Sequence, residues 1–343
     1  MAKTKQNPAV QAEAPEKEAA KLSLGERFAV FKSNRIVGIL TPFVFLAVTI
    51  ILFGVLTSGR MLTANNMQKL LNQGLIYAAL ATAVSVIYTM GDLDISIGAV
   101  MGVGAMLGAM AYNATSSTVV LVVVTIGSCL GLMMINCTLG TVLGLKSMSI
   151  AVIMMQIYSQ IQNKVIGASG AINVDFAAMN KLEGVLRYPL FFGYVILVFV
   201  IFQFTFFGRA DRFFGGNPIC AQQTGIRANQ IKYIAYVLAG LGVGVAAMLS
   251  IMRTGSVSTS TGNQMGTYCM LMTVLGGMSI FGGARSNTYA GLIGALTYTA
   301  LNMGLQMLNV SSSIIQGIRG VIFLILVYVN SEQNDLLPSR QMF

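Results

Sequence analysis

Two neighbouring aspartates have the greatest scope for chemistry in this chain. Asp92 and Asp94 lie between long apolar stretches, in the segment GDLDISIG at 91–98. Paired carboxyls inside helices could cleave peptide bonds within a membrane, and a carboxyl beside a basic group could relay protons. Here the pair falls in a short turn, histidine is absent, and no basic residue is near in sequence. Neither chemistry is favoured.

The turn itself has two interpretations. We expect Asp94 to cap the helix that follows, where the helix dipole favours a negative charge. The alternative is that Asp94, Ser96 and Gly98 form a structural turn that lines a solute pathway.

No other catalytic or metal-binding pattern is present. The sequence has no GxSxG, HExxH or Walker loop. The four cysteines, Cys129, Cys137, Cys220 and Cys269, are scattered without CxxC spacing. Three of them lie in apolar segments, as expected of buried structural thiols. We therefore predict no enzymatic activity, no metal and no cofactor, so any energy source would be an ion gradient or a partner protein.

The composition predicts an all-α integral membrane protein. Of 343 residues, 55% are hydrophobic and 9% charged, with a mean hydropathy of +0.74, whereas soluble domains carry roughly 25% charged residues. The net charge of +10 could suggest nucleic-acid binding. However, most basic residues lie in the first 36 positions or flank apolar runs, so we expect a lipid bilayer and not nucleic acid.

About ten segments are apolar and long enough to span a bilayer. Together they form a transmembrane domain at 37–330. A tail at 1–36 precedes this domain, and we expect it to be disordered and cytoplasmic. A cytoplasmic tail at 331–343 follows it. The fifth segment is interrupted by Gln156, Gln160, Gln162 and Asn163, which should face the bundle interior or an aqueous cavity. The expected spans are 37–57, 74–90, 95–114, 119–144, 148–167, 188–207, 232–252, 267–283, 289–309 and 313–330.

The distribution of Lys and Arg predicts both termini in the cytoplasm. With that orientation the cytoplasmic side holds the seven basic residues of the tail together with Lys146, Arg209, Arg212, Arg227, Lys232, Arg285 and Arg340. The outer side holds only Arg60, Lys69, Lys164, Lys181, Arg187 and Arg253, and Arg319 lies within the last span.

The longest cytoplasmic loop, 208–231, contains signals for a short helix. Gly215 and Gly216 should break the preceding helix, Asn217 and Pro218 form a good helix start, and Gly225 should end the helix about two turns later. Such a helix suits the docking of a soluble partner. Four further glycines, in the segment LGGMSIFGGAR, are expected to allow close packing within the eighth span in preference to a break: Gly276, Gly277, Gly282 and Gly283.

Three segments together resemble the membrane-spanning permease subunits of bacterial ABC importers for ribose and related monosaccharides. These segments are GDLDISIG at 91–98, GRADRFFGGNPICAQQTGI at 208–226, and VLGGMSIFGG at 274–283 followed by GLIGAL. Their order and separation also match, so the resemblance covers roughly residues 60–330. Asp92 departs from it, because the family usually has glycine there, and so does Gln222, where a second alanine is common.

The resemblance implies a ten-helix permease in the bacterial inner membrane. It would work with a second copy or a paralogue, two cytoplasmic ATPase subunits and an extracytoplasmic solute-binding protein. The short helix would couple the ATPases to the bundle through Gly215, Gly216, Asn217, Ala221 and Gly225. ATP would bind only to the partners.

Two alternatives stay open from the sequence. The first is a self-sufficient secondary transporter driven by a proton or sodium gradient, although few charged residues fall within the spans. The second is an ABC permease for nucleosides.

Overall fold

The computed structural model describes residues 35–279, 282–283 and 286–335, and in these ranges it contains twelve α-helices. Ten of them coincide with the expected spans, and α9 (Phe206–Gly216) and α10 (Pro218–Gln223) lie between the sixth and seventh. The expected tail at 1–36 lies almost wholly outside the described residues, as does the end of the tail at 331–343. The ten helices are α3 (Arg35–Leu56), α4 (Ala64–Thr89), α5 (Ile97–Thr115), α6 (Thr118–Val142), α7 (Ser147–Ile166), α8 (Phe176–Phe204), α11 (Ala228–Thr254), α12 (Met265–Leu275), α13 (Thr288–Met307) and α14 (Ser312–Asp335).

Five of the described helices, α4, α5, α6, α8 and α11, are long and apolar enough to cross a membrane. Three others contain shorter apolar stretches, at Leu40–Leu56, Met265–Leu275 and Ser312–Val327. The bundle is therefore that of a membrane protein, and the count of ten spans stays a prediction.

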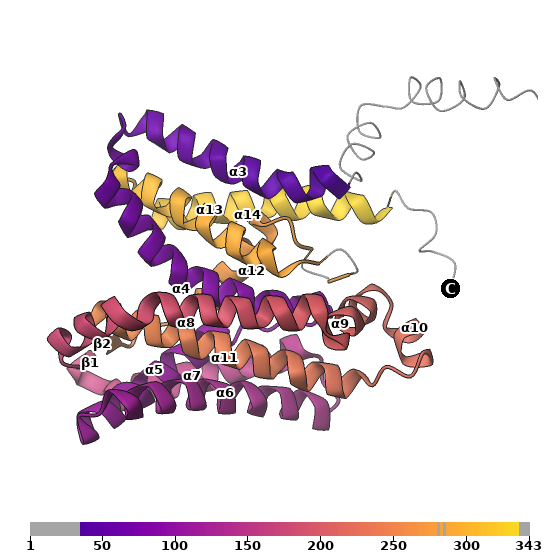
Figure 1. Ribbon diagram of the computed structural model, residues 1–343, viewed down its shortest axis with the longest axis horizontal. Helices are drawn as coiled ribbons and strands as arrows, with labels where there is room; N and C mark the ends of the chain where they lie inside the picture. The colour runs from indigo at the N-terminus through magenta and orange to yellow at the C-terminus, as the bar shows by residue number, and fades with distance from the viewer. Residues whose placement is uncertain (1–34, 280–281, 284–285, 336–343) are drawn as a thin grey trace, which may run out of the picture.

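The helices run roughly parallel to one long axis (Figure 1). The centre is formed by α4 and α11, which pack against each other and are largely buried. On one side α13 packs between α4 and α3; on the other, α6 packs against α5, α7 and α11. The start of α3, the end of α14, and the helices α9 and α10 all lie at the same end of the bundle (Figure 1).

The opposite end carries a small antiparallel sheet of β1 (Ala171–Asn173) and β2 (Ser256–Ser258). Two one-turn 3₁₀ helices, η2 (Arg60–Leu62) and η3 (Gly167–Ser169), also connect elements of the fold. This sheet ties the segment before α8 to the segment after α11.

Two spans begin earlier than predicted. Helix α4 starts at Ala64 and not near 74, and α8 starts at Phe176 and not near 188. The Asp175 carboxylate accepts hydrogen bonds from the amides of Ala177 and Ala178 and so fixes the start of α8. Hydropathy missed these turns because they are polar.

The eighth span is shorter than predicted, and the expectation for its glycines was wrong in part. Helix α12 ends at Leu275, and Gly276 is its C-cap. Gly277, Gly282 and Gly283 lie beyond it with positive φ angles of 81°, 73° and 126°, so these three serve chain breaks and not helix packing. Gly276 shows the expected close approach, since a β-carbon there would lie 1.8 Å from the Ala290 carbonyl oxygen, and so does Gly282, where one would lie 2.6 Å from the Thr89 carbonyl oxygen.

Candidate functional site

The three sequence segments that carry the resemblance meet at one end of the bundle. The Thr89 carbonyl oxygen, at the end of α4, accepts a hydrogen bond of 3.3 Å from the Gly283 amide. A β-carbon at Gly215 would lie 1.8 Å from this same oxygen, and one at Gly282 would lie 2.6 Å from it. The last turn of α9, the loop after α12 and the turn after α4 therefore touch through their backbones, which only glycine permits.

The expected short helix is present as α10. The Asn217 side chain caps it by accepting hydrogen bonds of 3.1 Å from the amides of Ile219 and Cys220, and Pro218 is its first residue. Thr224 ends it, and Gly225 follows with a φ of +85°. Ala221 is fully buried, whereas Ile219 is 70% exposed. This confirms the predicted caps and shows a helix that presents an apolar side chain outward.

The break before α10 differs from the prediction. The sixth span ends at Phe204, and Gly215 and Gly216 form the last turn of a separate helix, α9, whose chain break comes at Asn217. Asp211, on α9, is fully buried, and its carboxyl group makes no hydrogen bond to the described residues. Burial raises the pKa of this carboxyl well above its ordinary value, against the opposing charge of Arg212, so the neutral acid is favoured.

Asp94 organises the turn before α5. Its carboxylate, 1% exposed, accepts hydrogen bonds from the Ser96 amide at 2.8 Å and the Ser96 hydroxyl at 2.6 Å. Asn136 on α6 donates to the Ser96 hydroxyl, and Tyr158 on α7 donates to the Asn136 carbonyl oxygen. The N-cap residue of α5 is Ser96, and no side chain caps this helix, so the prediction that Asp94 caps it was wrong. Asp94 instead holds Ser96 in place.

Asp92 has the basic partner that sequence proximity did not reveal. Its carboxylate lies 3.1 Å from the Lys232 ammonium, near the start of α11. The Ser147 hydroxyl, at the start of α7, lies 2.7 Å from both groups. The pair is partly buried, with side-chain exposures of 28% for Asp92 and 14% for Lys232. It joins three elements at this end of the bundle.

We predict that Lys232→Met lowers the free energy of unfolding by about 1–2 kcal/mol, because it leaves the Asp92 carboxylate partly desolvated without a partner. Thermal unfolding in detergent should show this loss. Combining Lys232→Met with Asp92→Asn should recover part of it. Strictly additive effects of the two substitutions would contradict a coupled pair.

Two interrupted helices meet inside the bundle. Residues 91–96 run into it in a non-helical conformation before α5 begins, and residues 259–264 do so before α12. A β-carbon at Gly98 would lie 2.3 Å from the Gly262 carbonyl oxygen, and one at Gly266 would lie 2.0 Å from the Ile95 carbonyl oxygen. Helix α12 has 11 residues, or about 16 Å, and so covers about half of a 30 Å hydrocarbon core. Irregular backbone at membrane depth is tolerated where it lines a cavity.

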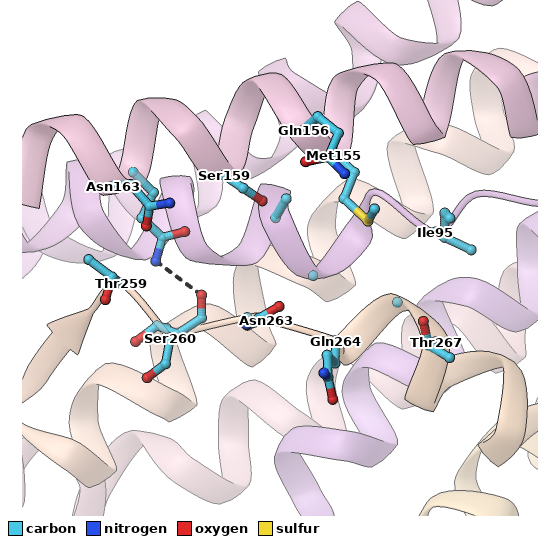
Figure 2. Close-up of a pocket in the computed structure, with 16 residues that line it drawn as sticks. Ile95, Met155, Gln156, Ser159, Asn163, Thr259, Ser260, Asn263, Gln264 and Thr267 are labelled. Carbon is cyan, nitrogen blue, oxygen red and sulfur yellow. Dashed lines mark hydrogen bonds between the residues drawn. The ribbon is translucent and has the colours of Figure 1, made fainter. Parts of the chain in front are cut away.

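Such a cavity, of about 390 Å³, lies between α7 and residues 259–264 (Figure 2). Ten of the sixteen lining residues have hydroxyl or amide side chains and none is charged or aromatic. The Gln162 amide closes one side by donating to the carbonyl oxygens of Ser258 at 2.8 Å and Thr261 at 3.1 Å. The lining is Ile95, Gly98, Ala99, Met155, Gln156, Ser159, Gln162, Asn163, Thr259, Ser260, Thr261, Gly262, Asn263, Gln264, Gly266 and Thr267.

The outward face of α7 carries both apolar and polar side chains. An open hollow of about 420 Å³ on this face is lined by Gln156, Ile157, Gln160, Ile161 and Lys164. The exposed polar side chains are those of Gln156, Gln160, Asn163 and Lys164. Such side chains are costly in contact with lipid tails. The sequence predicted that the polar residues of this span face the bundle interior or an aqueous cavity, and Gln156, Gln162 and Asn163 do line one. It did not identify the opposite wall, because residues 259–267 lie about a hundred positions further along the chain.

The comparisons with known proteins give the class of this chain. Residues 66–327 match the family described as branched-chain amino acid transport system / permease component. The chain belongs to this family and is the non-catalytic permease component of an ABC transporter.

Several curated relatives align over most of the chain. It is 28% identical over 283 residues to the ribose import permease protein RbsC of Escherichia coli K12, covering 79% of this chain and 87% of the relative. It is 24% identical to the D-allose transport system permease protein AlsC of the same strain, covering 79% and 84%. It is 27% identical to the autoinducer 2 import system permease protein LsrD of Klebsiella pneumoniae, covering 81% and 86%. No solved structure matches the chain.

Proposed function

We propose that this chain forms half of the membrane pathway of an ATP-driven importer for a monosaccharide or a similar small polar solute. The observation that supports it most is the capped helix α10, joined through α9 to the turn after α4 by glycine contacts with Thr89. A rigid element of this kind can transmit a push from a soluble subunit to the bundle.

The ATPase subunits would dock on α10. Ile219 supports this proposal, because an apolar side chain 70% exposed at the end of the bundle suits a protein contact. In this proposal Gly215 and Gly216 carry the movement into α9, and Asn217, Ala221 and Gly225 maintain the shape of the contact.

In the membrane, ten helices would span the bilayer with both termini in the cytoplasm. The common location of the α3 start, the α14 end and α10 supports an even number of spans (Figure 1). The extracytoplasmic solute-binding protein would then dock at the other end, near β1 and β2.

A second copy or a paralogue would complete the pathway. The exposed amides of α7 would face this partner across a water-filled route and not lipid. The turn at Asp94, Ser96 and Gly98 would hold the wall of this route through the contacts with Asn136 and Gly262.

The solute class is supported by the named relatives, two of which import ribose or D-allose. We expect cells that express this chain with its partner subunits to take up radiolabelled D-ribose or D-allose. Excess unlabelled sugar should compete with uptake, and L-leucine should not. Competition by L-leucine or by a nucleoside alone would reject the sugar assignment.

A further inference from the structure

The cavity between α7 and residues 259–264 contains unused hydrogen-bonding groups. Within the described residues, the side chains of Gln156, Ser159, Asn163, Asn263 and Thr267 make no hydrogen bond to the protein. Figure 2 shows Ser159 and Asn163 on α7, opposite Ser260, Asn263 and Gln264. Four of these five side chains are exposed and Ser159 is half-buried, so their donors and acceptors are available to water or to a solute.

We propose that this cavity is a solute subsite within each permease chain, selective for neutral polyhydroxylated molecules. The proposal rests on the proposed function, since it assigns a binding site to the transported solute. It adds that the chain itself contributes to selectivity.

The lining determines the class of ligand. Amides and hydroxyls both donate and accept, as the hydroxyls of a sugar do. None of the sixteen lining residues is charged to pair with the ammonium and carboxylate of an amino acid, or with a phosphate, and none is aromatic for a nucleobase to stack on. A neutral polyol is the solute that these groups satisfy. The volume of about 390 Å³ falls in the range of small-molecule sites.

The wall of the cavity is held in place by the protein's own contacts. Gln162 ties residues 258–261 to α7, and the Tyr268 hydroxyl orients Gln264 through a hydrogen bond of 2.6 Å. The α12 N-terminus has no side-chain cap, so the first-turn amides of Gly266 and Thr267 border the space as further donors. Interrupted helices in this arrangement provide polar groups at the depth where transporters bind their solutes.

The test uses cysteine protection in the assembled transporter, without binding protein. Asn263→Cys is introduced in a Cys220→Ser background, because Cys220 is exposed whereas Cys129, Cys137 and Cys269 are buried. We expect a membrane-impermeant thiol reagent to label this thiol, and saturating D-ribose or D-allose to slow labelling at least fivefold. L-leucine should have no effect. Thr115→Cys, exposed at the end of α5, is the control that neither sugar should protect.

A second measurement separates this site from the wider function. Asn163→Leu and Asn263→Leu should each lower the apparent affinity for sugar uptake about five- to tenfold, the effect of one or two lost hydrogen bonds, with unchanged ATPase association. If D-ribose and D-allose both leave the Asn263→Cys thiol unprotected, or if it does not react, the subsite is wrong even if ATP-dependent sugar uptake persists. If the unmodified transporter shows no ATP-dependent sugar uptake, the proposed function itself is rejected.

Discussion

Gly215→Val should insert into the membrane but transport no solute. The glycine lies where α9 meets the end of α4, and an added β-carbon would lie 1.8 Å from the Thr89 carbonyl oxygen and 3.1 Å from the Gly283 amide. Both contacts are with backbone, so rotating a side chain cannot relieve them, and α9 must move away from the bundle. In the proposed function this movement disconnects α10 from the turn that Asp94 organises.

The measurement is sugar uptake by cells with equal amounts of permease in the membrane, which should fall at least a hundredfold. Gly127→Val is the matched control, because Gly127 lies on α6 with no atom within 4 Å of an added β-carbon. Its uptake should stay near that of the unmodified chain. Normal uptake by the Gly215→Val protein would show that the contact between Gly215 and Thr89 is not needed to couple α10 to the bundle.

Removing residues 217–225 should abolish association with the ATPase subunits and leave membrane insertion intact. These residues form α10 and its terminating turn, which lie outside the ten helices expected to span the membrane. Ile219→Asp should have a nearly equal effect, because it places a charge where an apolar contact is expected. Co-purification of ATPase with tagged permease measures both.

Gln223→Ala provides the control for this surface, since Gln223 is exposed on the same short helix. Its ATPase association should change by less than twofold. ATPase that still co-purifies with the deletion variant would remove α10 from the coupling mechanism.

Much of the architecture could be predicted from local sequence. Long apolar runs gave ten segments that coincide with ten helices, and Asn217, Pro218 and Gly225 identified α10, because its caps are local features. The polar first turns of α4 and α8 were not predicted, because hydropathy detects only the apolar part of a helix and not turns that extend beyond it. Helix α9 was missed because its charged residues, Arg209, Asp211 and Arg212, are typical of a loop.

The site required contacts that are distant in sequence. Asp92 and Lys232 are far apart along the chain, and only the packing of α11 beside the turn places them 3.1 Å from each other. Gly276, Gly277, Gly282 and Gly283 are recognisable as a cluster, but their positions relative to the end of α12 depend on Thr89 and Ala290. The cavity likewise combines amides of α7 with residues 259–267, and it can be recognised only in the folded chain, where the two segments face each other.

In the proposed function this chain is a passive pathway, and the energy for transport comes from ATP hydrolysis in other subunits. The most direct test is uptake of D-ribose and D-allose into proteoliposomes that contain the permease, its ATPase subunits and its binding protein, with ionophores collapsing all ion gradients. We predict uptake that requires ATP and is lost when the ATPase subunits are omitted. Uptake by the permease alone, driven by a proton or sodium gradient, would show instead that the chain is a secondary transporter.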